Sequence, residues 1–529
     1  MQHPFQCIAS VRLPGEATSY DYLVTACGPR LTVVDVAMGE IASRWSTERA
    51  ASTTSNGDDD EQSERPKKKQ KTSTAAPRAS NIIKLIVSPD QTHIVTVTDD
   101  KLIRVFGVKT GGLLDELSQR CMPKRPCAIQ ILPDNATIIC GDKFGDVYSL
   151  PLLPSDSPVV TEQASAGAAE SEVSKKEKEA AFKPSATNLT VHTKRNRKAL
   201  EAQMAQKDFT NKKEPLKFEH KLLLGHVSML TDVLYATREV ERKHRGYIIT
   251  ADRDEHVRIS RGPPQSHIIE GYCMGHTHFV SKLCLIPGTD MLVSGGGDDD
   301  LYVWDWPTGK LRRKYEIFGA MLGLPYVGDT VMNDGSTQQA ATVGDMSDHK
   351  VAVSGLCTAP FTNAKGQQET ALLVTCERVP ALFVIPVNRL QLVKKYEITQ
   401  IDLDYPPLDI TCIGDIVVIS LDGRKDGQYR LTANKLVQPN ADDKGHVMLK
   451  PDEDTEARLK CLVGSAEGVR ADDKELDELF YSVANLRKRG GWVTPGEDVA
   501  AEDDPVDAEA DPNGTEIVEM EDDATVRKA

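Results

Sequence analysis

The sequence predicts an all-β fold, a β-propeller of seven blades with long disordered inserts, a C-terminal helix and an acidic disordered tail. One observation is that short segments of alternating apolar and polar residues recur in pairs, such as HIVTVT with KLIRVF and YIITA with HVRIS. The other is length: without its low-complexity stretches the chain keeps about 310 residues, or seven units of roughly 44, the size of a four-stranded blade. A closed ring leaves only short strand edges, which suits an all-β chain of this size.

Low-complexity stretches interrupt and end the repeat. The inserts cover residues 48–79, 151–217 and 321–350 and are typical of long surface loops. The net charge is −15, from 79 acidic and 64 basic residues, and nearly all of the excess lies after residue 439. Residues 497–529 hold 13 acids, two bases and no aromatic residue, so they cannot bury enough apolar surface to fold alone.

These shifts in composition predict three parts: a propeller over residues 1–439, a C-terminal extension over 440–496 and an acidic tail over 497–529. In the extension, residues 472–489 place apolar side chains at helical spacing on one stripe, with acids in the first turn and bases in the last. We therefore predict one amphipathic helix over 472–489, ended by Gly490-Gly491, with its apolar stripe covered by the propeller.

One repeat unit, which begins at Gly275, carries the most complete polar pattern. A histidine opens the unit, a serine stands on its second strand, an aspartate follows in the turn and a tryptophan ends its third strand. Inside a blade these side chains can satisfy one another through a hydrogen-bond chain, which gives them an architectural role. They are His276, Ser294, Asp298 and Trp304. The unit resembles a WD repeat, and the resemblance implies a WD-repeat propeller.

Other units carry part of this pattern. Gly225-His226 is followed by Thr250 and Asp254, with Ser260 where the tryptophan would stand. In an earlier unit Phe106 takes the place of the tryptophan. These blades are predicted mainly from hydrophobic alternation.

Several clusters resemble chemical sites but lack the full set of ligands. Gly295–Gly297 leads into a strand, whereas a nucleotide-binding loop opens a helix. Asp298–Asp300 lacks the alternating carboxylates and distal glutamate of a calcium loop. Cys273, His276 and His278 lack a fourth zinc ligand. We predict no catalytic residue, no metal and no cofactor, and free thiols for the 11 cysteines, which form no CxxC pair.

No run of about 18 apolar residues occurs, so we expect a soluble, intracellular protein without a membrane span.

Four segments go beyond the generic repeat: residues 141–152, 247–263, 275–287 and 485–492. Together they resemble the WD-repeat, non-catalytic subunit of the tRNA guanine-N7 methyltransferase. The resemblance implies a protein without methyltransferase activity of its own. It would bind, stabilise and activate a separate S-adenosylmethionine-dependent subunit that forms 7-methylguanosine in the variable loop of tRNA. It also implies a heterodimer that contacts tRNA mostly through the catalytic partner.

The resemblance places a partner-binding surface around the DRDE turn that precedes the strand HVRIS. Val257 and Ile259 face one side of that strand, so we expect Arg258 to project from the other side. We predict partner contacts by the residues that the repeat does not require, namely Arg253, Glu255, Arg258 and Lys143. Asp254 has two open roles, in the blade's hydrogen-bond network and at the partner. A solvated turn is the alternative for the whole segment, and Phe144 is expected to pack within its own turn.

Basic residues suggest two further contacts. Arg487, Lys488 and Arg489 could touch tRNA phosphates or only complement a helix dipole, and both readings stay open, as does RNA contact by the basic insert 183–217. The run RPKKKQK lies in a predicted disordered loop and is typical of a nuclear import signal, with a solvated lysine cluster as the alternative. Its basic residues include Lys67, Lys68, Lys69 and Lys71. We therefore expect the nucleus as the location, with the cytoplasm also open.

Two other functions compete with the tRNA methyltransferase subunit. One is a WD-repeat scaffold of another nuclear complex, such as a chromatin or ubiquitin-ligase adaptor. The other is a propeller enzyme, which would need acid, base or metal ligands converging on the central channel, and the motifs show no such set.

Overall fold

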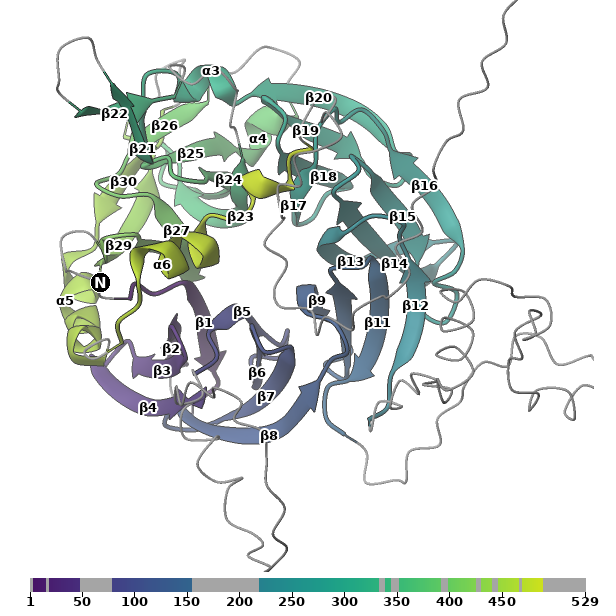
Figure 1. Ribbon diagram of the computed structural model, residues 1–529, viewed down its shortest axis with the longest axis horizontal. Coiled ribbons are helices and arrows are strands. Elements are labelled where there is room, and N and C mark those ends of the chain that lie inside the picture. Colours follow the sequence, from purple (N-terminus) through teal and green to yellow (C-terminus); the bar gives the residue numbers. More distant parts are fainter. Residues whose placement is uncertain are drawn as a thin grey trace, which may run out of the picture. The chain divides into compact units, whose positions relative to one another are not determined.

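The computed structural model describes residues 3–15, 19–47, 79–154, 218–332, 338–343, 352–391, 398–424, 430–439, 446–465 and 469–488. The chain divides into a compact unit, Met1–Arg487, and a second unit, Lys488–Ala529, of which only Lys488 is described. The first unit contains seven four-stranded antiparallel blades arranged in a ring (Figure 1), and the predicted propeller is confirmed.

Each blade uses four strands that are consecutive in the sequence. Blade 1 contains β1 (Cys7–Leu13), β2 (Tyr20–Cys27), β3 (Arg30–Asp35) and β4 (Glu40–Ser46). Blade 2 contains β5 (Ile82–Val87), β6 (His93–Thr98), β7 (Leu102–Lys109) and β8 (Leu113–Cys121). Blade 3 contains β9 (Pro126–Ile131), β10 (Thr137–Asp142), β11 (Asp146–Pro151) and β12 (Lys221–Gly225).

Blade 4 contains β13 (Leu230–Val240), β14 (Lys243–Asp252), β15 (Val257–Arg261) and β16 (Ile269–Cys273). Blade 5 contains β17 (Val280–Leu285), β18 (Met291–Gly296), β19 (Asp300–Asp305) and β20 (Lys310–Glu316). Blade 6 contains β23 (Val353–Thr362), β24 (Gln368–Cys376), β25 (Ala381–Pro386) and β26 (Thr399–Asp402). Blade 7 contains β27 (Pro407–Ile413), β28 (Ile416–Leu421), β29 (Arg430–Val437) and β30 (Met448–Pro451).

The remaining elements lie between or after the blades. A hairpin of β21 (Pro325–Met332) and β22 (Gln338–Thr342) follows blade 5. The short helices are α3 (Phe318–Met321), α4 (Val387–Leu390) and α5 (Glu453–Leu459), followed by η3 (Lys460–Ser465), α6 (Asp473–Phe480) and η4 (Ala484–Leu486). No helix in the described part of the chain is long and apolar enough to cross a membrane.

Three predicted boundaries need correction. The stretch 321–350 is not wholly a loop, because part of it forms the β21–β22 hairpin. The propeller extends past residue 439, because the short strand β30 completes blade 7. The helix predicted over 472–489 ends at Phe480, and a separate 3-10 turn follows at 484–486.

Buried apolar side chains form clusters between neighbouring blades, so both faces of a blade are covered. For example, Ile103 and Val105 of blade 2 pack with Ile138 of blade 3. Likewise Val257 of blade 4 packs with Trp304 of blade 5. A side chain that points away from one of these clusters therefore points towards the neighbouring blade on the other side. Arg258, described below, is such a side chain.

Blades 1 and 7 close the ring without sharing a strand. The amide of Ile8 donates to Oδ2 of Asp409 at 2.8 Å, and the amide of Ser10 donates to Oγ1 of Thr411 at 3.1 Å. Leu459 and Leu462, from α5 and η3, pack in the same apolar cluster as residues of both blades. The C-terminal extension thus completes the closure that the two terminal blades begin.

Candidate interaction surface

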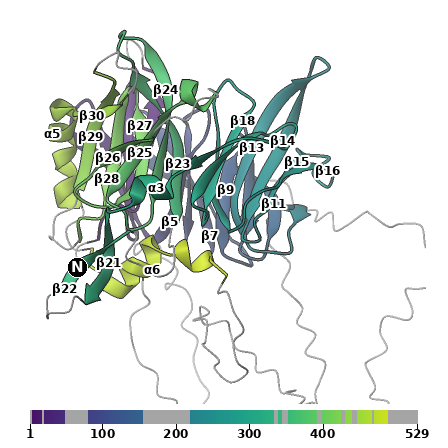
Figure 2. The ribbon, with the colours of Figure 1, turned by 90° about the horizontal axis from the view of Figure 1, so that it is seen from above.

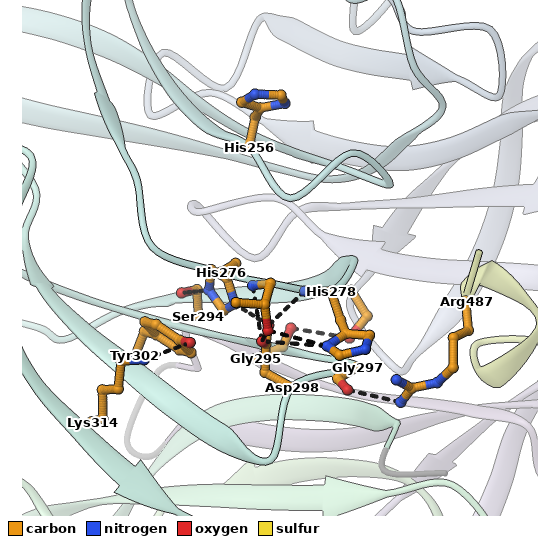
Figure 3. A network of polar contacts seen from close by, with 12 residues as sticks. His256, His276, His278, Ser294, Gly295, Gly297, Asp298, Tyr302, Lys314 and Arg487 are labelled. Carbon is orange, nitrogen blue, oxygen red and sulfur yellow. Dashed lines mark hydrogen bonds and ion pairs between the residues drawn. The ribbon is translucent and has the colours of Figure 1, made fainter. Parts of the chain in front are cut away.

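A polar network inside blade 5 brings the four predicted architectural residues together, and Figure 3 shows His276, Ser294 and Asp298 among them. His276 lies 2.6 Å from Oδ2 of Asp298 through Nδ1 and 2.6 Å from Oγ of Ser294 through Nε2. The indole Nε1 of Trp304 donates to Oγ of Ser294 at 2.7 Å. Burial alone would raise the pKa of Asp298, but the hydrogen bonds from His276 and Thr277 lower it to about 2. The carboxylate is therefore ionised and fixes the loop that enters the blade.

Blade 4 repeats the network with a different aspartate. His226 lies 2.8 Å from Oγ1 of Thr250 and 3.1 Å from Oδ2 of Asp252. Oδ1 of Asp252 also accepts the amides of Asp254 and His256 at 2.9 and 3.0 Å. The network role considered for Asp254 thus belongs to Asp252, because Asp252 at the end of β14 reaches both the histidine and the turn.

Arg258 points from the face of β15 opposite Val257, as expected, but this face lies inside the propeller and not at an open surface. Its side chain donates from Nε to Oγ of Ser260 at 2.9 Å and from Nη1 to the carbonyl of Gly225 at 3.0 Å. The residue is only 9% exposed, and burial lowers the pKa of its guanidinium. The face of β15 opposite Val257 is covered by blade 3, so Arg258 joins two blades. Its contact with a partner stays a prediction.

Two turns and one loop form a continuous surface, which we call the docking surface: residues 142–146, 226–229 and 252–256. The amide of His226 donates to the carbonyl of Gly145 at 2.9 Å, and the amide of Arg253 donates to the carbonyl of Met229 at 3.0 Å. Gly145 has φ of 95°, and an added Cβ would lie 2.6 Å from the carbonyl oxygens of His226 and Ser228. Only glycine therefore allows this close approach of the first turn to the loop.

The docking surface combines exposed apolar side chains with basic ones. Phe144 is 54% exposed and Val227 fully exposed, so the expectation that Phe144 packs within its turn is wrong. Lys124 and Lys143 place their ammonium groups 4.4 and 5.7 Å from the centroid of the Phe144 ring. Aromatic anchors with charged neighbours are typical of protein interfaces.

The predicted contact residues of the DRDE turn lie on this surface and are partly buried. Within the turn Glu255 has a left-handed φ of 73°, and the carboxylate of Asp252 holds this shape by accepting the amides of Asp254 and His256. The side chain of Arg253 is directed along the surface, because Nε donates to the carbonyl of Leu486 at 2.9 Å. No local pattern in the sequence indicates that the C-terminal extension lies beside this turn.

Residues 472–487, which we call the C-terminal strap, run across one face of the ring (Figures 1 and 2). This is the face that carries the turns between the second and third strands of the blades. At blade 7, the hydroxyl of Tyr481 donates to Oδ2 of Asp422 at 2.6 Å, and Arg424 donates to Asp477. Contact with blade 6 comes from the carboxylate of Glu377.

The strap then reaches blades 5 and 4. Nη2 of Arg487 donates to the carbonyl of Gly297 at 2.7 Å (Figure 3), and its guanidinium lies 5.7 Å from the Phe279 ring centroid. Leu486 meets Arg253 of blade 4. Arg487 is thus anchored to the propeller, Lys488 is exposed, and Arg489 lies outside the described residues. Lys67, Lys68, Lys69, Lys71 and residues 183–217 also lie outside them.

Glu377 explains why the predicted helix stops early. Its carboxylate accepts the amide of Val483 at 2.6 Å and the amide of Ala484 at 2.9 Å, and so caps the 3-10 turn instead of an extended helix. The side chain of Tyr481, the residue after α6, is buried against the propeller. A contact 106 residues away in the sequence therefore overrides the helical periodicity.

Glu377→Gln is expected to change how stability depends on pH. Burial raises the pKa of Glu377 from 4.5 to about 7, so the folded state holds this proton more tightly than the unfolded state. Wild-type stability therefore falls as the pH rises from 4.5 towards 7, whereas glutamine does not titrate. Between about pH 5 and about pH 8, the free energy of unfolding of wild type should therefore fall by roughly 3 kcal/mol relative to that of the variant. Urea unfolding of both proteins measures this, and a constant difference would contradict the assignment.

The innermost strands, which line the central channel, carry charged residues that belong to no sequence motif. Asp232 on β13 accepts the amide of Leu283 on β17 at 2.9 Å, as Asp409 does for Ile8. The charge of Lys84 and burial together lower the pKa of Lys282 to about 8. These carboxylates tie neighbouring blades together. Only an alignment of the first strands of the blades with one another would have singled out these two aspartates.

No metal or thiol chemistry emerges from the described residues. They contain no group of three or more His, Cys, Asp or Glu side chains placed to hold a metal ion. All the cysteines are free, and burial raises the pKa of thiols such as Cys7 and Cys376 to about 12. These thiols are protonated near neutral pH, so they are poor nucleophiles.

The sequence is similar to known proteins. The family description "tRNA methyltransferase TRM82 WD40 domain" matches residues 23–440. A Coccidioides immitis protein described as "tRNA (guanine-N(7)-)-methyltransferase non-catalytic subunit TRM82" is 39% identical over 451 residues, 81% of each chain. A Phaeosphaeria nodorum protein with the same description is 37% identical over 514 residues, which cover 93% of this chain and 99% of the relative. A solved structure of the RRP9 WD40 repeats is 11% identical in sequence and has a TM-score of 0.44. The match covers 80% of this chain and 88% of that chain.

Proposed function

The chain belongs to the TRM82 WD40 domain family, and from this membership we propose that it is the non-catalytic subunit of a tRNA guanine-N7 methyltransferase. The observation that carries the proposal is the 37% identity to the Phaeosphaeria nodorum subunit over 99% of that protein's length. So long an alignment covers the propeller as well as the segments outside it.

In this function the propeller acts as a rigid platform for a separate catalytic subunit. The docking surface supplies the exposed Phe144 and Val227 as apolar anchors, with Lys143 and the DRDE turn around them. A protein that binds the folded form of its partner stabilises that form, so association alone would raise the amount of active enzyme. The S-adenosylmethionine chemistry and most of the contact with tRNA then reside in the partner.

The competing reading, a scaffold of another nuclear complex, gains no support from the comparisons. The comparisons do not support a propeller enzyme either, because the curated relatives are described as non-catalytic subunits.

We further propose that the protein enters the nucleus through the basic run that includes Lys67, Lys68, Lys69 and Lys71. Replacing these four lysines by glutamine should shift a fluorescently tagged chain towards the cytoplasm. An unchanged distribution would contradict the proposal.

Deletion of the gene tests the proposed function. Mass spectrometry of nucleosides from purified tRNA should show that 7-methylguanosine falls strongly, while other methylated nucleosides are unchanged and serve as the control. Reintroduction of the wild-type gene should restore the 7-methylguanosine. A normal level in the deletion strain would overturn the proposal.

A further inference from the structure

The C-terminal strap contacts the turns of four successive blades and touches the docking surface near its C-terminal end. It meets blade 7 through Tyr481, blade 6 through Val483 and Ala484, and blade 5 through Arg487. It also meets blade 4 through Leu486, the residue before Arg487, whose carbonyl accepts from Arg253. The hydrogen bond between Arg253 and Leu486 therefore joins the strap to the docking surface at the turn of blade 4.

The geometry points to the strap as a positioning element for partner binding: by presenting the Leu486 carbonyl it fixes the side chain of Arg253 in the orientation that the catalytic subunit recognises. This inference rests on the proposed function. It assigns Arg487 and Glu377 a role in specificity although neither belongs to the docking surface.

The arrangement leaves Arg253 little freedom. The strap backbone on either side of Leu486 is fixed, because Glu377 accepts the Val483 and Ala484 amides and Arg487 reaches Gly297. Leu486 itself closes the 3-10 turn, its amide donating to the carbonyl of Val483 at 3.0 Å. A fixed carbonyl holds a flexible arginine in one orientation before binding, so less side-chain entropy is lost in the complex.

Arg487→Met is the direct test, because it removes the bond to Gly297 and keeps an unbranched side chain over Phe279. Binding to the purified catalytic subunit, without tRNA, should weaken on the order of tenfold. Arg487→Lys, which can still donate to the Gly297 carbonyl, should recover part of the affinity. Arg312→Met, which removes an exposed bond to Asp305 on blade 5, is the matched control and should bind like wild type.

A double-mutant cycle separates positioning from a direct contact by the strap. If Arg487 acts through Arg253, Arg487→Met should have little further effect in an Arg253→Ala background. Equal binding by wild type and Arg487→Met would overturn the inference, and so would two effects that simply add. Failure of the wild-type chain to bind the catalytic subunit would instead count against the proposed function.

Hydrogen exchange of the free chain gives a readout that needs no partner. Arg487→Met should speed exchange in the strap and in the turn 252–256, while the turn 142–146 keeps its wild-type rate. Unchanged exchange at 252–256 would show that the strap does not hold this turn, and would also overturn the inference.

Discussion

Trp304→Ala is expected to lower the free energy of unfolding by about 3 to 5 kcal/mol, the usual cost of removing a large buried aromatic side chain. Trp304 is fully buried between blades 4 and 5, stacks on Tyr302 with ring centroids 5.6 Å apart and donates to Ser294. The substitution removes this packing and leaves the Ser294 hydroxyl with one partner fewer. Urea unfolding followed by circular dichroism measures the loss.

Trp304→Phe is the matched control for this prediction. Phenylalanine keeps one aromatic ring but loses the indole donor and leaves a small cavity, so the expected loss is about 2 kcal/mol, less than for alanine. Equal losses for the alanine and phenylalanine variants would mean that the hydrogen bond, and not the packing, dominates this site.

Arg258→Glu is expected to destabilise the propeller by about 3 to 5 kcal/mol, because it places a carboxylate without its partners in a buried site. Arg258 is nearly buried and bonds the Gly225 carbonyl, which a glutamate would meet with a second acceptor. The variant should therefore unfold at a lower urea concentration, and loss of partner binding would follow from lost structure. Stability equal to wild type would contradict the buried position.

Two controls separate charge from burial in this experiment. Arg258→Met keeps the side-chain volume and should cost less than the glutamate. Arg245→Glu reverses a charge on the neighbouring strand β14, where the side chain is 41% exposed, and should change stability by about 0.5 kcal/mol or less.

The blade pattern could be predicted because it depends on local signals. Alternation over five or six residues located the second and third strands of blades 2 to 5, and the Gly-His opening with Trp304 predicted blade 5. The strand β30 has only four residues, which is too short for an alternating pattern to be recognised.

The position of individual site residues could not be predicted, because it depends on contacts between blades. Alternation correctly separated Arg258 from Val257 and Ile259, but it treated the other face of the strand as solvent, and blade 3 covers that face. The early end of α6 likewise depends on Glu377. The orientation of the Arg253 side chain depends on its hydrogen bond to Leu486. Each of these contacts spans more than 30 residues of sequence.

The central claim is that this propeller has no methyltransferase activity and supports a partner that has. The direct measurement is the rate of 7-methylguanosine formation in a tRNA transcript by the purified catalytic subunit, with S-adenosylmethionine, with and without this chain. We predict no product from this chain alone and a much higher rate from the two proteins together than from the catalytic subunit alone. An equal rate and equal thermal stability of the catalytic subunit with and without this chain would contradict the claim.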